Sequence, residues 1–128
     1  MNARAINLSA ELNNLPGLTG RTPDTPDCDL EGKAFGPTYD YRDGFISTVR
    51  FSGLSAWERH AGDEILLIAE GDGFLHLIDD EGWEVPRSLS TNLMIVVPAN
   101  TWHRIQSSKG IALVTITPQP TTHRAERP

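Results

Sequence analysis

Two short segments of the sequence carry side chains that could bind a metal ion. In the first segment, Glu58, His60 and Glu64 lie within seven residues of one another. Residues two apart in a β-strand point to the same face, so Glu58 and His60 should project together. A turn at residues 61–63 then lets the chain reverse, and Glu64 begins the next strand beside them. In the second segment, His103 begins a strand after a turn and supplies another imidazole.

Two imidazoles and two carboxylates form a mixed nitrogen and oxygen ligand set. Such a set suits Fe(II), Mn, Ni, Co or Zn, and His60, Glu64 and His103 alone satisfy a two-histidine, one-carboxylate site with open positions. Glu58 has three interpretations: a fourth ligand that makes the site more anionic, a general base or pocket acid beside a three-ligand metal, or a solvated residue. The alternative for the whole set is a pair of hydrogen-bonded core histidines without a metal.

His76 is the other histidine for which a chemical role is open. It lies in residues 73–78, a segment that is mostly apolar on both faces, so a core position and a pocket position both fit. In a pocket, its ordinary pKa of about 6.5 would suit acid–base chemistry. Glu58 and His76 are therefore the candidates for proton transfer, whereas His123, near the end of the chain, is expected in solvent.

The elements that must position these residues are short strands. Between residues 45 and 118, about eight β-type runs alternate with turn residues at intervals of about 8–12 residues, which indicates an antiparallel sandwich or barrel. Residues 1–44 are interrupted by Gly and Pro every few positions, and we expect an arm packed on the barrel or on a partner subunit. Residues 119–128 are rich in Pro, Thr and Arg and are expected to fray.

Two of the predicted strands are apolar on both faces, at residues 64–69 and 93–97. Both faces of such a strand must be covered. The barrel core covers one face, and either the arm or a second subunit covers the other. We therefore expect a homodimer, with the arm as the alternative cover.

The two metal-binding segments resemble the two motifs of the cupin superfamily. The first motif corresponds to the stretch from Gly53 to Gly71, and the second to the stretch from Pro98 to His103. Three positions depart from the family pattern. Glu58 replaces the first histidine of motif one, Asn100 replaces the glycine of motif two, and Gln106 and Ser107 follow where the family has an asparagine.

This resemblance implies a small, single-barrel, metal-binding cupin with an all-β fold. The barrel would be a double-stranded β-helix, or jelly roll, with an N-terminal arm and one divalent metal ion inside one end. The implied function is a metal-dependent enzyme that acts on a small polar organic molecule, foremost an oxidoreductase of the dioxygenase type. The alternatives are an isomerase, epimerase or dehydratase that uses no oxygen, and a non-catalytic module that binds a small ligand or sugar.

Composition excludes several other classes of protein. Eleven Lys and Arg stand against 17 Asp and Glu, a net charge of −6, which argues against a nucleic-acid partner. The single cysteine, Cys28, forms no intramolecular disulfide and no multi-thiolate zinc site. No apolar run approaches the roughly 20 residues of a membrane span, and no signal-peptide core is evident. We expect a cytoplasmic protein whose partners are a small-molecule substrate and a second copy of itself.

Overall fold

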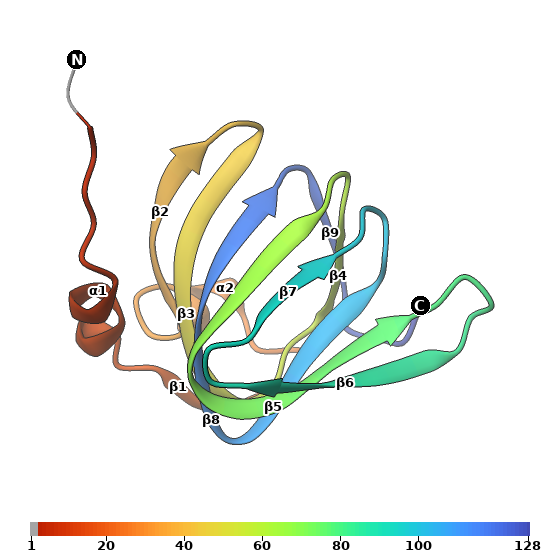
Figure 1. Ribbon diagram of the computed structural model, residues 1–128. Helices are drawn as coiled ribbons and strands as arrows, with labels where there is room; N and C mark the ends of the chain where they lie inside the picture. Colours follow the sequence, from red (N-terminus) through yellow and green to blue (C-terminus); the bar gives the residue numbers. More distant parts are fainter. Residues whose placement is uncertain (1–2) are drawn as a thin grey trace.

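The computed structural model describes residues 3–128 and has the all-β fold that the strand pattern predicts (Figure 1). Two short helices lie near the N-terminus, and strands make up most of the rest. The elements in chain order are α1 (Leu8–Asn14), β1 (Leu18–Arg21), α2 (Asp27–Leu30), β2 (Phe35–Tyr41), β3 (Gly44–Leu54), β4 (Trp57–His60), β5 (Glu64–Ile78), β6 (Glu84–Ser90), β7 (Met94–Val97), β8 (His103–Pro118) and β9 (Thr121–Arg124).

Strands β5 and β8 form the long central pair of the barrel. They are 15 and 16 residues long, pair antiparallel with each other, and curve so that the sheet wraps around a core (Figure 1). Gly71 allows β5 to bend where its register with β8 shifts. Its φ is +83°, and a Cβ at this position would lie 2.2 Å from the carbonyl oxygen of Gly110, so only glycine fits.

The other strands extend the sheet on both sides of this pair. β3 pairs antiparallel with β8, while β6 and β7 pair antiparallel with different halves of β5. β4 pairs with β8 on one side and with β9 on the other, both antiparallel. The start of β8 is thereby brought beside β4, and the turn at residues 61–63 connects β4 to the start of β5, so the candidate ligands come from these three strands.

The core lies between the curved halves of the sheet and includes residues of the arm. Leu66, Ile68 and Leu75 of β5 are each at most 2% exposed and pack against residues of β3, β7 and β8. Leu30 and Ala34 of the arm belong to the same cluster and are 4% and 0% exposed. The arm is therefore part of the hydrophobic core as well as a cover on its outside.

The sheet extends beyond the range of residues 45–118 that the strand spacing predicts. In the arm, β1 pairs parallel with β3 and β2 pairs antiparallel with β3. The expected fraying of the tail is wrong, because residues 121–124 form β9 along the edge of β4. Pairing with distant strands supplies the backbone hydrogen bonds that the arm, which is rich in Gly and Pro, and the tail, which contains Pro, cannot make locally.

The two segments that are apolar on both faces lie in β5 and β7, and part of their outer face is exposed to solvent. Met94 and Val96 of β7 are 61% and 49% exposed, next to Ile65 and Leu67 of β5. The arm packs on β3, and within residues 3–128 nothing buries Met94 or Val96. A second subunit on this face stays a prediction.

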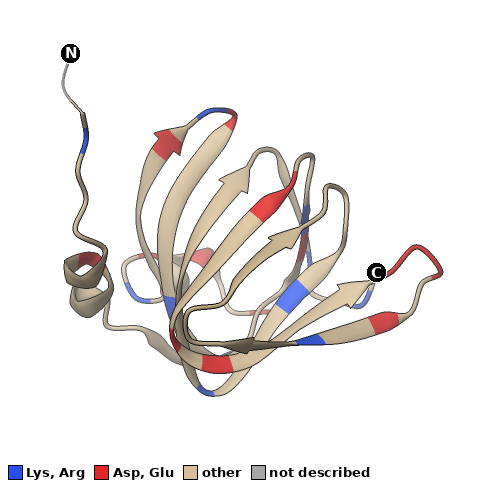
Figure 2. Ribbon diagram, viewed as in Figure 1, with Lys and Arg blue, Asp and Glu red and all other residues tan. Residues whose placement is uncertain are grey.

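Charged groups are distributed unevenly over the strands. Figure 2 shows Lys and Arg scattered singly, whereas acidic residues gather in the loop between β5 and β6, at residues 79–81. Among the described residues, neither helix is long and apolar enough to cross a membrane.

Candidate metal centre

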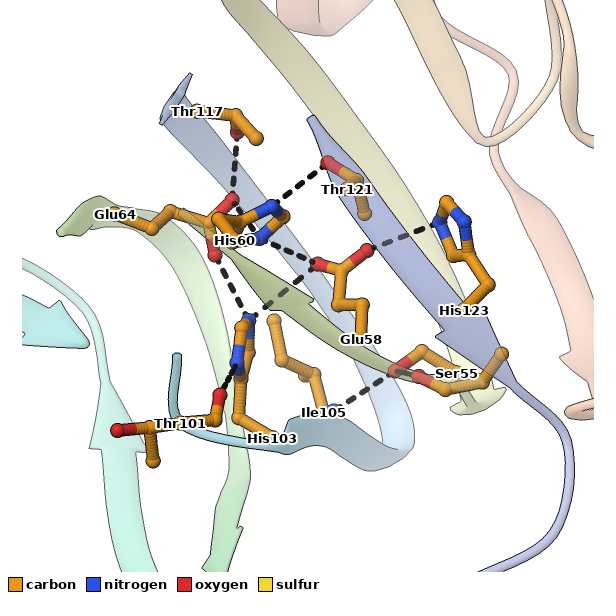
Figure 3. Close-up of polar contacts among 11 residues, drawn as sticks. Ser55, Glu58, His60, Glu64, Thr101, His103, Ile105, Thr117, Thr121 and His123 are labelled. Carbon is orange, nitrogen blue, oxygen red and sulfur yellow. Dashed lines mark hydrogen bonds and ion pairs between the residues drawn. The ribbon is translucent and has the colours of Figure 1, made fainter. Parts of the chain in front are cut away.

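The structure brings together the four side chains that the sequence singles out. Glu58 and His60 come from β4, Glu64 from the start of β5 and His103 from the start of β8 (Figure 3). One ligand atom from each residue lies within 4.8 Å of the others. His60, Glu64 and His103 are 3%, 2% and 1% exposed, whereas the side chain of Glu58 is 32% exposed.

Strand pairing and two linked turns set this geometry. Glu58 lies directly opposite His103 in the ladder between β4 and β8, so both side chains share a face. The turn after β4 is tied to the turn before β8, because Asn100 donates its backbone N–H to the His60 carbonyl at 2.8 Å. Asn100 has a φ of +60°, the left-handed backbone that asparagine tolerates where the cupin motif has glycine.

Glu64 links the two histidines through its two carboxylate oxygens. Oε1 lies 3.0 Å from Nε2 of His103, and Oε2 lies 3.2 Å from Nε2 of His60. Glu58 is more distant, with Oε1 3.6 Å from Nε2 of His60 and 3.5 Å from Nε2 of His103. The result is a tight buried group of three residues, with a fourth carboxylate on its exposed side.

A second layer of contacts orients the three buried side chains. Nδ1 of His103 donates to the carbonyl oxygen of Thr101 at 2.9 Å, and Nδ1 of His60 lies 2.7 Å from Oγ1 of Thr121. The hydroxyl of Thr117 donates to Oε2 of Glu64 at 2.6 Å. Because a carbonyl can only accept, the neutral form of His103 keeps its proton on Nδ1 and directs the Nε2 lone pair at the cluster.

The electrostatics of the metal-free cluster favour two charged imidazoles and two charged carboxylates. Burial lowers the histidine pKa values, but Glu58 and Glu64 outweigh it and raise the pKa of His60 to about 9 and that of His103 to about 10. Burial likewise opposes ionisation of the carboxyls, yet hydrogen bonds from the histidines hold the pKa of Glu58 well below its usual value and also lower that of Glu64. The four charges sum to zero.

These residues fit a divalent metal ion. Nε2 of His60 is buried and makes no hydrogen bond of regular geometry among the described residues; its polar neighbours are the carboxylate oxygens of Glu64 at 3.2 Å and of Glu58 at 3.6 Å. A buried nitrogen that faces two carboxylates without a regular hydrogen bond is explained if the cluster holds a cation. A divalent ion would replace the two imidazole protons and leave the net charge unchanged, with ligands that suit Fe(II), Mn, Ni, Co or Zn.

His76, the other residue proposed for proton transfer, does not join this cluster. It lies opposite Arg104 in the β5–β8 ladder, whereas its neighbour Leu77 lies opposite His103, so His76 projects from the other face. Its Nδ1 is 3.2 Å from a Glu84 carboxylate oxygen and its Nε2 is 3.1 Å from Oε1 of Gln106. The sequence could not decide the face, because both faces of this segment are mostly apolar.

His123 and the threonines around the cluster were missed by reasoning from the sequence. His123 lies opposite Glu58 in the β4–β9 ladder, and its Nε2 is 3.4 Å from Oε2 of Glu58, although its side chain is 63% exposed. The hydrogen bond to Glu58 raises the pKa of His123 despite some burial. The signal was present, because Thr121 and His123 are two apart and would share one face of a strand.

A cavity of about 240 Å³ opens on the exposed side of the cluster. Glu58 and His123 form part of its wall, and residues of the arm form much of the rest. The buried members His60, Glu64 and His103 do not line it. Glu58 is therefore the member of the cluster that borders the cavity.

Comparison with solved structures identifies the fold. NMB1881 from Neisseria meningitidis is 22% identical with a TM-score of 0.61, over 91% of this chain and all of that chain. A cupin-like protein from Thermotoga maritima is 20% identical with a TM-score of 0.54, over 62% of this chain and 63% of that chain. A hydroquinone 1,2-dioxygenase from Sphingomonas sp. TTNP3 is 19% identical with a TM-score of 0.51, over 65% of this chain and 60% of that chain.

The chain therefore has the cupin fold, as its two motifs predict. No family model matches the sequence, and no curated protein matches it. At these identities the structural likeness defines the fold and leaves the reaction to be argued from the site.

Proposed function

We propose that this protein is a metal-dependent enzyme of the dioxygenase type that acts on a small polar organic molecule. The observation that carries the proposal is the separation of the cluster into two parts. His60, Glu64 and His103 form a buried group joined by contacts of 3.0 and 3.2 Å, while Glu58 stands 3.5 to 3.6 Å from the histidines and faces a cavity.

The buried group has the composition of a non-haem iron site. Two histidines and one carboxylate bind Fe(II) on one side and leave positions open for substrate and oxygen. When bound, such an ion supplies Lewis-acid activation and the redox chemistry with oxygen. A dioxygenase adds both atoms of molecular oxygen to its substrate and needs no further reductant. Thr101, Thr117 and Thr121 would hold the three ligands in orientation through the hydrogen bonds described above.

Glu58 would act on the substrate as a proton acceptor. It is ionised in the metal-free protein, its Oε1 faces the histidines, and it borders the cavity through which a substrate would reach the cluster. A substrate hydroxyl that entered the cavity would meet this carboxylate before the buried ligands. Transfer of that proton to Glu58 would leave an anionic oxygen next to the cation. Hydroquinone 1,2-dioxygenases among the similar folds, one of them described in complex with Cd²⁺, support this ranking.

An isomerase, epimerase or dehydratase is the second candidate, and the position of Glu58 favours it. A partly exposed carboxylate beside a cation can remove and return a proton on carbon without any oxygen. Both candidates use the same residues, so the consumption of oxygen separates them. A non-catalytic module for a small ligand would show neither oxygen uptake nor proton exchange.

The first experiment is elemental analysis of protein purified without chelators. We expect about one equivalent of a divalent transition metal in the wild type and in His76→Ala, and none in His103→Ala. His76→Ala is the matched control because it removes a histidine outside the cluster. Absence of metal from all three proteins, after addition of Fe(II), Mn, Ni, Co and Zn in turn, would contradict the proposal.

The second experiment follows oxygen uptake by the iron-loaded protein with hydroquinone as the probe. We expect uptake that is lost in His103→Ala and reduced in Glu58→Gln. If a panel of phenols and small acids gives no uptake, exchange of solvent deuterium into the same compounds under anaerobic conditions would support the isomerase alternative instead.

A further inference from the structure

Arg21, at the end of β1 in the arm, is a cation without a partner. Its guanidinium carbon lies 4.7 Å from the centre of the Phe51 ring and 5.1 Å from that of Phe35. Its Nε is buried without a hydrogen-bond partner, and no ion pair within residues 3–128 includes this side chain. Burial lowers the pKa of Arg21, while Glu58 and Asp27 act in the opposite direction. Stacking on two aromatic rings accounts for its position but leaves its hydrogen-bond donors unused.

The backbone holds Arg21 in place through a contact that only glycine permits. Arg21 pairs with Gly53 in the parallel ladder between β1 and β3. Gly53 has a φ of +113°, and a Cβ there would lie 2.2 Å from the carbonyl oxygen of Arg21. Gly53 is also the glycine that opens the first cupin motif of this chain. Gly53 therefore begins the metal-binding segment and also allows strand β1 of the arm to pack against that segment.

Arg21 borders the same cavity as Glu58 and His123. Asp27 also borders the cavity, but it is exposed to solvent, which weakens its effect on the guanidinium. With a divalent ion bound, the charges of Glu58 and Glu64 are balanced by the ion. The positive charge of Arg21 then remains to attract an anion, together with that of Arg124, which also borders the cavity.

We propose that Arg21 binds a carboxylate group of a small organic acid and holds the acid in the cavity next to Glu58. An arginine guanidinium matches a carboxylate in shape and can donate two parallel hydrogen bonds to it. A cavity of about 240 Å³ is smaller than ordinary ligand pockets, which run from about 300 to 1,000 Å³, and this favours a small acid over a nucleotide. The inference names the substrate class for the proposed enzyme and rests on that function, but the anion site itself does not require the metal.

The test is a titration with acetate, followed by NMR, on metal-free and zinc-loaded protein. Acetamide, which has nearly the same shape and no charge, is the matched probe. Arg21→Met removes the charge and keeps an apolar side chain against Phe51 and Phe35, while Arg21→Lys keeps the charge. Arg87→Met is the control variant, since Arg87 is an exposed arginine on β6 and its loss changes the net charge equally.

We expect acetate to bind the wild type and Arg87→Met alike, and Arg21→Met to bind it about 10- to 100-fold more weakly. Arg21→Lys should retain part of the affinity, and acetamide should not distinguish the variants. Equal acetate binding by wild type and Arg21→Met, or no acetate binding by the wild type, would overturn the inference. If Arg21→Met fails to fold, the comparison of acetate with acetamide takes its place. Acetate that binds no more tightly than acetamide, both to the wild type and to Arg21→Lys, would then overturn the inference.

This experiment can contradict the carboxylate site at Arg21 and the proposed metal-dependent function independently of each other. Arg21 is not a ligand, so its variants should retain as much metal as the wild type. Metal-loaded protein that shows no effect of Arg21 on acetate affinity would contradict the carboxylate site alone. Protein that takes up no metal, but binds acetate through Arg21 in the metal-free titration, would contradict the proposed function alone.

Discussion

Nε2 of His103 lies 3.0 Å from Oε1 of Glu64, although the two residues are 39 positions apart in the chain. In the metal-free protein this contact is a hydrogen bond from a charged imidazole to a carboxylate, because the pKa of His103 is raised to about 10 and that of Glu64 is lowered. A metal ion must take the place of that proton to use both atoms as ligands. Binding of metal and loss of protons are therefore linked in this site.

We predict that metal binding at pH 7 releases about two protons, one each from His60 and His103. Their pKa values in the metal-free protein are about 9 and about 10, so both carry a proton at pH 7. Apparent metal affinity should then rise as the pH increases through neutrality and level off above about pH 10. Calorimetry in buffers of different ionisation enthalpy measures the number of protons, and release of fewer than one would contradict the assigned ligands.

We predict that Thr117→Val weakens metal binding by about 10- to 100-fold without abolishing it. The hydroxyl of Thr117 donates to Oε2 of Glu64 at 2.6 Å and so fixes the orientation of that ligand. Thr115→Val is the matched control, because Thr115 lies two residues earlier on the same strand, is 9% exposed and makes no hydrogen bond to Glu64. Competition with a chromophoric chelator gives both affinities, and equal losses in the two variants would indicate a general packing defect.

We predict that the stability of the metal-free protein depends on pH through the same cluster. The raised pKa values of His60 and His103 contribute stability that is complete below about 6.5 and is lost as the pH rises through about 9 to 10. The lowered pKa values of Glu58 and Glu64 contribute stability that is complete above about 4.5 and is lost at lower pH. From these four groups, unfolding in urea should be most difficult between about pH 4.5 and 6.5.

His103→Gln should flatten the alkaline limb of this profile, while His76→Ala should leave the shape unchanged. The reason is that His76 pairs with Glu84 on the other face and takes no part in the cluster. An alkaline limb that is the same in wild type and His103→Gln would contradict the assignment of the titrating groups.

The cluster could be predicted from the sequence because its geometry depends on local rules. Alternation along β4 places Glu58 and His60 on one face, and the short turn at residues 61–63 brings Glu64 beside them. The second segment follows the family motif closely enough to add His103. The positive φ of Asn100 also agrees with the tolerance expected of asparagine at that turn.

The parts that could not be predicted depend on pairing between distant segments. Arg21 reaches the cavity because β1 pairs with β3, and His123 reaches Glu58 because β9 pairs with β4. Neither segment has the long β-type run from which strands are predicted, since Gly and Pro interrupt the first and Pro118 and Pro120 precede the second closely. His76 was ambiguous for a different reason, because a segment that is apolar on both faces carries no period from which to choose a side.

We predict that the protein self-associates through the outer face of β7 and the adjoining part of β5. Met94 is 61% exposed and Val96 is 49% exposed, and they lie opposite Leu67 and Ile65, so four apolar side chains form one neighbouring group on this face. Sedimentation of the wild type should show a dimer, and Met94→Glu should weaken it by about tenfold or more, since a charge would be buried in the contact. Trp83→Glu is the control, because Trp83 is 69% exposed but lies in the loop between β5 and β6. A wild type that remains monomeric at high protein concentration, or a dimer that Met94→Glu does not weaken, would contradict this interface.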